Sequence, residues 1–208
     1  MWTATGRATE LVSDSDASSA GQSASASPAS RDVGTGTDDP TAPVPLVDDQ
    51  GRPVLNKDGK QIMRPAGLDP HMFVAAGLRD RERILAMAAA GASTGALAAE
   101  ILSVVVHLWK FQRWHSWDAQ RVGREYNSEF VDYATIAIGL YAASAGIPRN
   151  IILRIEDYIT RSSQYKENPK MDQTYTHLPT TNVWNTDLGH ELYQSGRIGV
   201  AGTPSVVP

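Results

Sequence analysis

The chain has 208 residues, 41% of them hydrophobic, and a formal net charge of −4. It contains no cysteine, which excludes a disulfide framework, a cysteine nucleophile and a zinc or iron–sulfur site with thiolate ligands. Proteins that bind nucleic acid usually carry a surplus of basic residues, so the acidic balance argues modestly against that class and leaves only a local basic patch open.

The first 68 residues are expected to lie outside the main domain. Residues 1–44 are rich in Ser, Ala, Thr, Gly and Asp and poor in large apolar side chains. Such a segment cannot bury enough surface to offset its chain entropy, so we predict a disordered leader. Residues 45–68 alternate short apolar runs with the turn signals DDQGR and NKDGK. This pattern predicts a hairpin or linker segment, which could dock on the domain or cover it.

The remaining chain predicts an all-α fold, with a single helical domain at residues 69–199 and a loose tail at residues 200–208. Asp69 is a good N-cap acceptor and is followed by Pro70, which suits the first position of a helix. The first helix should therefore extend to about Ala90. A second helix, capped by Ser93 or Thr94, should continue into the octet WHSWDAQR at 114–121.

Three further helices are expected. The third should start near Asn127 or Ser128 and end at Gly146, and the fourth should follow Pro148 with isoleucines at amphipathic spacing. Residues 162–184 indicate a long polar loop. The last helix should run from Asn185 or Thr186 to Ser195. We see no internal repeat.

The stretch from Ile84 to Trp109 is long enough to span a bilayer. Glu100 interrupts it, and a charge in mid-span costs about 2.5–3.5 kcal/mol on insertion scales. We therefore interpret the stretch as two buried helices separated at Gly91, with a membrane-disrupting module as an alternative.

No motif of high specificity is present: the sequence has no Walker loop, GxSxG, HExxH or dinucleotide fingerprint. Its histidines are scattered, and no two share the spacing of a helical turn. They are His71, His107, His115, His177 and His190. We therefore expect neither a metal site nor a cofactor.

Acidic residues are the better candidates for catalysis. Asp118, Glu129 and Asp132 fall within fifteen positions, and Glu129 and Asp132 should share one face of the third helix, beside Tyr133. Carboxylates beside aromatic rings suit the cleavage of a glycoside, in which one acid protonates the leaving oxygen and a second stabilises or supplies the nucleophile. The alternatives are that Glu129 belongs to a solvated face near a helix N-terminus and that Asp118 caps the following turn.

Two groups of residues could bind a substrate. In the octet, Trp114 and Trp117 fit either core packing or substrate contact, and Arg121 could bind a phosphate in an RNA-cleaving site with His115 and Asp118. In the second group, Trp184 precedes Asp187, which we expect in the first turn of the last helix with His190 three residues further on. An Asp–His pair can orient an imidazole as a base, although capping is the alternative.

Residues 109–199 resemble the polymorphic toxin type 44 family, the C-terminal toxin modules of bacterial competition proteins. The residues that carry the resemblance are Trp117-Asp118, Asp132-Tyr133, Gly139, AASAGIP at 142–148, Asp187, Tyr193 and Gly196. Gln120 stands where the family usually has Lys, and ATIAIG replaces its GNF-aromatic-YG segment. The resemblance implies that Asp118, Asp132 and Asp187 are catalytic.

The resemblance also implies a secreted antibacterial effector with a cognate immunity protein. The leader would engage a secretion-machine component or chaperone, and the effector would be delivered into target bacterial cells. The first hypothesis is a hydrolase that cuts the glycan strand of peptidoglycan in the periplasm. The second is an RNase acting in the recipient cytoplasm, and the third is the non-catalytic, membrane-disrupting module.

Overall fold

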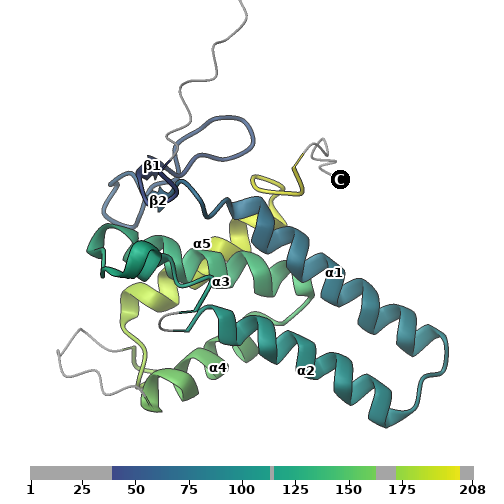
Figure 1. Ribbon diagram of the computed structural model, residues 1–208. Helices are drawn as coiled ribbons and strands as arrows, with labels where there is room; N and C mark the ends of the chain where they lie inside the picture. The colour runs from purple at the N-terminus through teal and green to yellow at the C-terminus, as the bar shows by residue number, and fades with distance from the viewer. Residues whose placement is uncertain (1–38, 113–114, 163–171, 202–208) are drawn as a thin grey trace, which may run out of the picture. The chain divides into compact units, whose positions relative to one another are not determined.

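The computed structural model describes residues 39–112, 115–162 and 172–201, all within the unit Thr37–Pro208. Its elements, in chain order, are β1 Pro43–Pro45, β2 Met63–Pro65, α1 Pro70–Ala89, α2 Thr94–Lys110, the 3-10 helices η1 Ala119–Arg124 and η2 Ser128–Phe130, α3 Val131–Ala145, α4 Arg149–Ser162 and α5 Thr180–Gln194 (Figure 1). Five α-helices and one two-stranded antiparallel sheet confirm the all-α fold with a small hairpin segment. The predicted leader lies outside the described residues except for 39–44, and so does most of the predicted tail.

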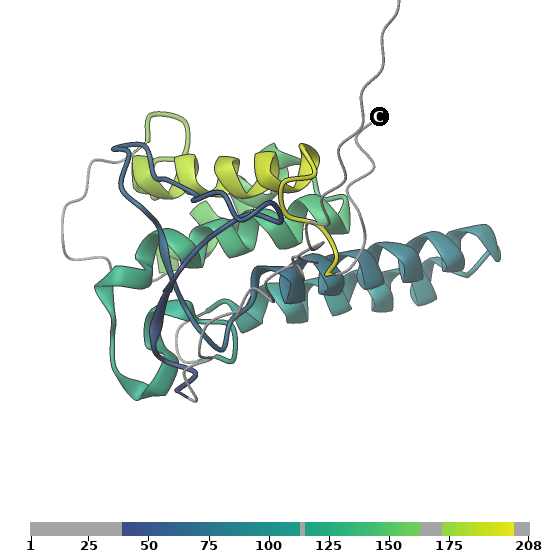
Figure 2. The ribbon, with the colours of Figure 1, turned by 90° about the horizontal axis from the view of Figure 1, so that it is seen from above.

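Helix α3 lies at the centre of the bundle. It packs against α1 and α5, while α2 packs on α1 and α4 contacts both α3 and α5. Figure 2 shows α3 between α5 and the α1–α2 pair. Of the fifteen residues of α3, nine are buried. A helix surrounded by neighbours in this way has to be apolar nearly all round, as the sequence of α3 is.

Two glycines allow α3 and α5 to approach closely. A Cβ atom added at Gly139 of α3 would lie 2.3 Å from the carbonyl oxygen of Thr186, and one added at Gly189 of α5 would lie 2.3 Å from that of Ile136. Real Cβ atoms do not come this near to backbone oxygens. The two helices are therefore in backbone contact, which explains in physical terms why glycine stands at position 139.

Gly139→Ala is expected to lower the free energy of unfolding by about 3 kcal/mol, because the new methyl group meets backbone that can yield only if α3 and α5 separate. Urea unfolding followed by circular dichroism measures this. Gly95→Ala is the matched control: Gly95 is an exposed helical glycine, where an added Cβ would meet Ser93 Oγ at an ordinary contact distance of 4.0 Å. That change should raise stability by about 0.5–1 kcal/mol. Equal effects of the two substitutions would contradict the close approach.

The β1–β2 segment contains an eight-residue repeat that we did not predict. PLVDDQGR at 45–52 and PVLNKDGK at 53–60 place Leu46 and Val54 at equivalent buried positions, and Ile62 follows eight residues later. These three residues form a closed ring of backbone hydrogen bonds of 2.8–3.0 Å, in which each amide donates to the carbonyl of another. The Gln61 side-chain amide donates to all three carbonyl oxygens of the ring.

Equivalent residues shape the two turns of the repeat. Asp48 Oδ1 accepts from the amides of Gln50 and Arg52, just as Asn56 Oδ1 accepts from the amides two and four residues later. The other oxygen of Asp48 accepts from the guanidinium groups of Arg52 and Arg197. Burial on its own would raise the pKa of Asp48, but these hydrogen bonds together hold it below the ordinary value. The first turn is thereby fastened to the C-terminal end of the domain.

Two predicted helix boundaries were wrong. The second helix ends at Lys110, before the octet, because the chain turns back there and the amide of Trp117 donates to the Lys110 carbonyl. The last helix begins at Thr180, five residues before the expected cap at Asn185. The side chains of Asn185 and Thr186 bind partners on other elements instead of capping, so tertiary contacts override the local signal.

The other expected boundaries agree with the structure, except that the 3-10 helix η2 precedes α3, so the third helix begins at Val131 and not near Asn127 or Ser128. Asp69 and Ser93 cap α1 and α2, and Gly146 ends α3 with a left-handed φ of 76°. The apolar stretch is broken at Gly91 as predicted, also with positive φ. The expectation that its two helices are buried was wrong, because among the described side chains from Ile84 to Trp109 only Leu108 is buried. Within the described ranges, none of the helices combines the length and apolar content that crossing a bilayer requires.

Candidate functional site

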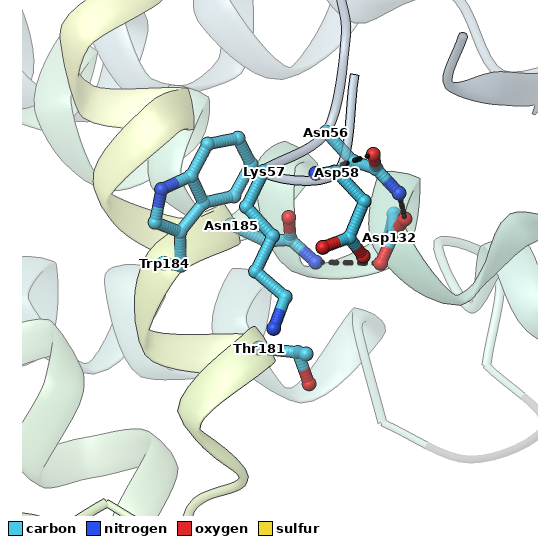
Figure 3. A pocket seen from close by; sticks show the side chains of 7 residues that line it. All are labelled: Asn56, Lys57, Asp58, Asp132, Thr181, Trp184 and Asn185. Carbon is cyan, nitrogen blue, oxygen red and sulfur yellow. Dashed lines mark hydrogen bonds between the residues drawn. The ribbon is translucent and has the colours of Figure 1, made fainter. Parts of the chain in front are cut away.

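A pocket of about 170 Å³ lies where the second turn of the repeat meets α3 and α5. Figure 3 shows the side chains that line it. They are Asn56, Lys57, Asp58, Asp132, Thr181, Trp184 and Asn185. Two of the predicted site residues, Asp132 and Trp184, therefore lie in one pocket, although they are far apart in the sequence.

Asp132 is held by amide groups from two different elements. Its Oδ2 accepts a hydrogen bond of 3.1 Å from Asn56 Nδ2, and its Oδ1 accepts one of 2.8 Å from Asn185 Nδ2 (Figure 3). Both oxygens thus act as acceptors, as those of an ionised carboxylate do. Since Asp132 stands in the first turn of α3, the positive end of the helix dipole also favours its negative charge. The carboxylate is fixed in position at the edge of the pocket.

The first turns of α5 supply the opposite wall. Thr181, Trp184 and Asn185 are three and four residues apart and therefore lie on one face of the helix. Asn185 is buried and binds Asp132, while Trp184 is partly exposed and presents an indole to the pocket. An indole beside polar groups is a surface on which a sugar or a base can stack.

The turn of the repeat contributes two charges of opposite sign. Lys57 and Asp58 are exposed, and the turn is positioned by the hydrogen bonds within it that Asn56 accepts. Figure 3 shows the Lys57 side chain extending along the α5 side of the pocket and Asp58 near the middle. Asp58 and Asp132 therefore provide two carboxylates to one pocket, and Lys57 provides a cation.

The structure places Asp118 and Arg121 away from this pocket. Asp118 is buried, caps η1 through the amide of Gln120 and forms an ion pair of 2.9 Å with Arg121. The Arg121 guanidinium also lies over the ring of Tyr126. The interpretation of Asp118 as a cap agrees with this geometry. Its carboxylate is engaged in local structure and does not line the pocket at Asp132.

The predicted aromatic residues divide between core and pocket. Tyr133 has no exposed surface, and its hydroxyl donates to the Leu68 carbonyl at 2.6 Å. Trp117 is buried among aromatic rings, with the ring of His107 stacked on it at 5.3 Å. Neither ring has a face open to a ligand in this structure. Trp114 lies outside the described residues. Among the predicted aromatic contacts that the structure describes, Trp184 lines the pocket, whereas Trp117 and Tyr133 do not.

Trp117 covers a buried polar cluster that the sequence did not reveal. The Asp80 carboxylate accepts a hydrogen bond of 2.6 Å from the Tyr141 hydroxyl and contacts His107 Nδ1. Burial, together with the hydrogen bond to Asp80, raises the pKa of Tyr141 far above its ordinary value. The cluster joins α1, α2 and α3 inside the core.

Glu129 is not part of α3, where Asp132 lies. It lies in η2, one turn before α3 begins, and its side chain is exposed. Asn127 caps this turn by accepting from the Glu129 amide. The location fits the alternative of a solvated residue near a helix N-terminus.

Asp187 and His190 lie in the middle of α5, so the expected first-turn position of Asp187 was wrong. Asp187 forms a two-point ion pair with Arg149 of α4. His190 is buried, and burial lowers its pKa. No hydrogen bond joins the two side chains among the described contacts, and neither residue lines the pocket.

The pocket also contains residues that we had not predicted as functional. Asn56, Lys57 and Asp58 belong to NKDGK, which we interpreted only as a turn, and Asn185 was interpreted as a cap. The available signal was the pair of charged residues at the tip of a turn in a segment that could dock on the domain or cover it. The described residues contain no cluster of three or more potential metal ligands.

Comparison of the chain with models of protein families, with curated proteins and with solved structures found no match.

Proposed function

We propose that this chain is a secreted antibacterial effector whose helical domain hydrolyses the glycan strand of peptidoglycan, with the pocket at Asp132 as its active site. The observation that carries the proposal is the meeting of Asp132, Asp58 and Trp184 in one pocket. Glycoside hydrolysis requires two carboxyl groups, and an aromatic wall is a common platform for a sugar ring.

The geometry suggests how the residues would share the work. Asp132 is fixed by Asn56 and Asn185, so it is suited to act on the sugar as nucleophile or as a stabiliser of the positive charge that develops there. Asp58, which lies on the turn, would donate a proton to the leaving oxygen. Trp184 would hold the sugar ring against the two carboxyl groups.

The biological setting follows from the resemblance to polymorphic toxins and is part of the proposal. The effector would act in the periplasm of target cells, and the producer would be protected by an immunity protein that closes the pocket. The N-terminal leader would bind a secretion-machine component or a chaperone.

Lys57 favours a second candidate, an RNase acting in the recipient cytoplasm. Its ammonium group lies in the same pocket as a fixed carboxylate, and a base together with a phosphate-binding cation is what RNA cleavage needs. The groups first considered for this activity, around Asp118 and Arg121, are engaged with each other instead.

The test uses the full chain, expressed in bacteria with and without a periplasmic export signal, and purified protein incubated with isolated sacculi at pH 4–8. We expect killing only after export, and release of soluble muropeptides from the sacculi. Growth arrest without export, together with degraded cellular RNA, would favour the RNase. Intact sacculi across the pH range and intact RNA would overturn both enzymatic proposals.

A further inference from the structure

The outer face of α2 carries a stripe of large apolar side chains that nothing in the described structure covers. Ile101, Leu102, Val105, Val106 and Trp109 are each between 49% and 59% exposed. Their spacing places them on one side of the helix, over its C-terminal half. We call these five residues the α2 stripe.

The opposite side of α2 is already occupied. Leu108 belongs to the hydrophobic core, Val104 packs against that core, and the helix packs on α1. The helix is therefore apolar on both sides, although a helix at a protein surface normally turns a polar face to water. Figures 1 and 2 show that the connected ends of α1 and α2, which include the N-terminal half of α2, extend beyond the other helices.

The area of the stripe is that of an interface rather than of scattered surface residues. Five half-exposed side chains of this size leave on the order of 500 Å² of apolar surface in water, comparable to the largest patch on a typical monomer. Two such faces placed together would bury on the order of 1,000 Å² in total, the lower limit for a specific protein interface.

The stripe is complementary to itself when two helices run antiparallel. Small exposed residues, Ala98 and Ala99, precede the branched residues, and the bulky Trp109 ends the series. An antiparallel pair places Trp109 of each copy over Ala98 of the other, with Leu102 and Val105 near the two-fold axis. Large residues then meet small ones, as close packing requires.

The neighbouring charges argue for protein over lipid. Arg81, Glu82 and Arg83 are exposed and alternate in sign along α1, and the whole chain is acidic. Anionic lipid surfaces attract clusters of basic residues, which this pattern lacks. The stripe is uncharged, small side chains lie at one end of it and Trp109 lies at the other, and its area suits an interface. We infer that a second copy of this chain covers the α2 stripe, in an antiparallel two-fold dimer.

The first experiment measures the mass of the full chain by sedimentation at 1–100 μM. We expect twice the mass of one chain for the wild type and a dissociation constant at least tenfold weaker for Val105→Glu, with unchanged circular dichroism. Tyr158→Glu is the matched control, because Tyr158 is 75% exposed and belongs to a different helix, α4. A monomeric wild type at 100 μM, or equal weakening by both variants, would overturn the proposal.

The second experiment tests the direction of the pair and uses the absence of cysteine in the chain. Ile101→Cys and Val106→Cys variants are oxidised separately and as a mixture. Antiparallel pairing should cross-link mainly the mixture, whereas parallel pairing would cross-link each variant with itself and would refute the arrangement. A monomeric chain that sediments with phosphatidylglycerol vesicles would assign the stripe to a lipid surface instead.

Discussion

Replacing Asp132 by asparagine is expected to reduce the release of muropeptides from sacculi at least 100-fold. Asn185 and Asn56 hold the Asp132 carboxylate at the wall of the pocket, and an amide at the same place can neither attack nor stabilise a positive sugar carbon. Losses on the order of 10²–10⁴ are usual when a proton-transferring or charge-stabilising group is removed. Initial rates on purified sacculi measure the effect.

Stability has to be measured beside activity, because the amide of the variant faces one of the two asparagine donors as a second donor. We expect Asp132→Asn to cost about 1–2 kcal/mol of unfolding free energy and to leave the chain folded. Glu82→Gln on the exposed side of α1 is the control and should retain full activity. Trp184→Ala should raise KM more than it lowers kcat if the indole binds the sugar. A folded Asp132→Asn variant with wild-type rates would refute the assignment of the active site.

The helices could be predicted largely because their boundaries depend on neighbouring residues. Asp69 accepts from an amide two residues away, Ser93 from one three residues away, and Gly146 takes up the left-handed conformation by itself. Each of these interactions involves residues that are close together in the sequence, so a short stretch of sequence is enough to predict it. The predicted helix start at Asn185 was wrong because the Asn185 side chain binds a residue on another element, Asp132.

The pocket could not be predicted, since its contacts join distant parts of the chain. Asp132 is bound by residues 76 and 53 positions away. The side-chain oxygen of Asn56 accepts turn-forming hydrogen bonds equivalent to those of Asp48. Its side-chain nitrogen, which aspartate lacks, donates to Asp132. The NKDGK pattern predicts a turn, but it does not predict which part of the domain the turn contacts.

The same reasoning explains why the predicted carboxylates do not gather. Asp118 forms contacts within its own turn, and Asp187 pairs with Arg149, 38 residues away on a helix whose position the sequence does not give. Acidic residues close together in sequence therefore lie in separate environments. Asp132 is instead held at the edge of the pocket by the neutral amide groups of Asn56 and Asn185.

A buried acid between α4 and α5 leads to the strongest prediction for stability. Glu156 is 7% exposed, and both of its carboxyl oxygens contact the hydroxyl of Thr186. Burial raises the pKa of Glu156 from 4.5 to about 8, which the hydrogen bond from Thr186 only partly opposes. The negative charge of neighbouring Asp187 acts in the same direction as burial. The folded protein therefore holds this side chain protonated and neutral at pH 7.

The consequence is a loss of stability as pH rises. Between pH 4.5 and about 8 the unfolded chain has released the Glu156 proton while the folded chain retains it. The folded state then binds more protons, so this group lowers the unfolding free energy by about 1.4 kcal/mol per pH unit. Its stabilisation is fully present below pH 4.5 and is lost as pH rises through the folded pKa. Over the whole window the loss is on the order of 4–5 kcal/mol.

Glu156→Gln should remove this dependence, because glutamine resembles the protonated acid and does not titrate. We expect the variant to match the wild type at pH 4 and to exceed its unfolding free energy by several kcal/mol at pH 8, as measured by urea titration at pH 4, 6 and 8. His190 is common to both proteins, so its own titration cancels in the difference. Glu191→Gln, an exposed change on α5, is the matched control and should differ from the wild type by a constant of no more than about 0.5 kcal/mol. A difference between Glu156→Gln and the wild type that does not grow with pH would show that Glu156 is ionised in the folded state, in contradiction to its neutral burial beside Thr186.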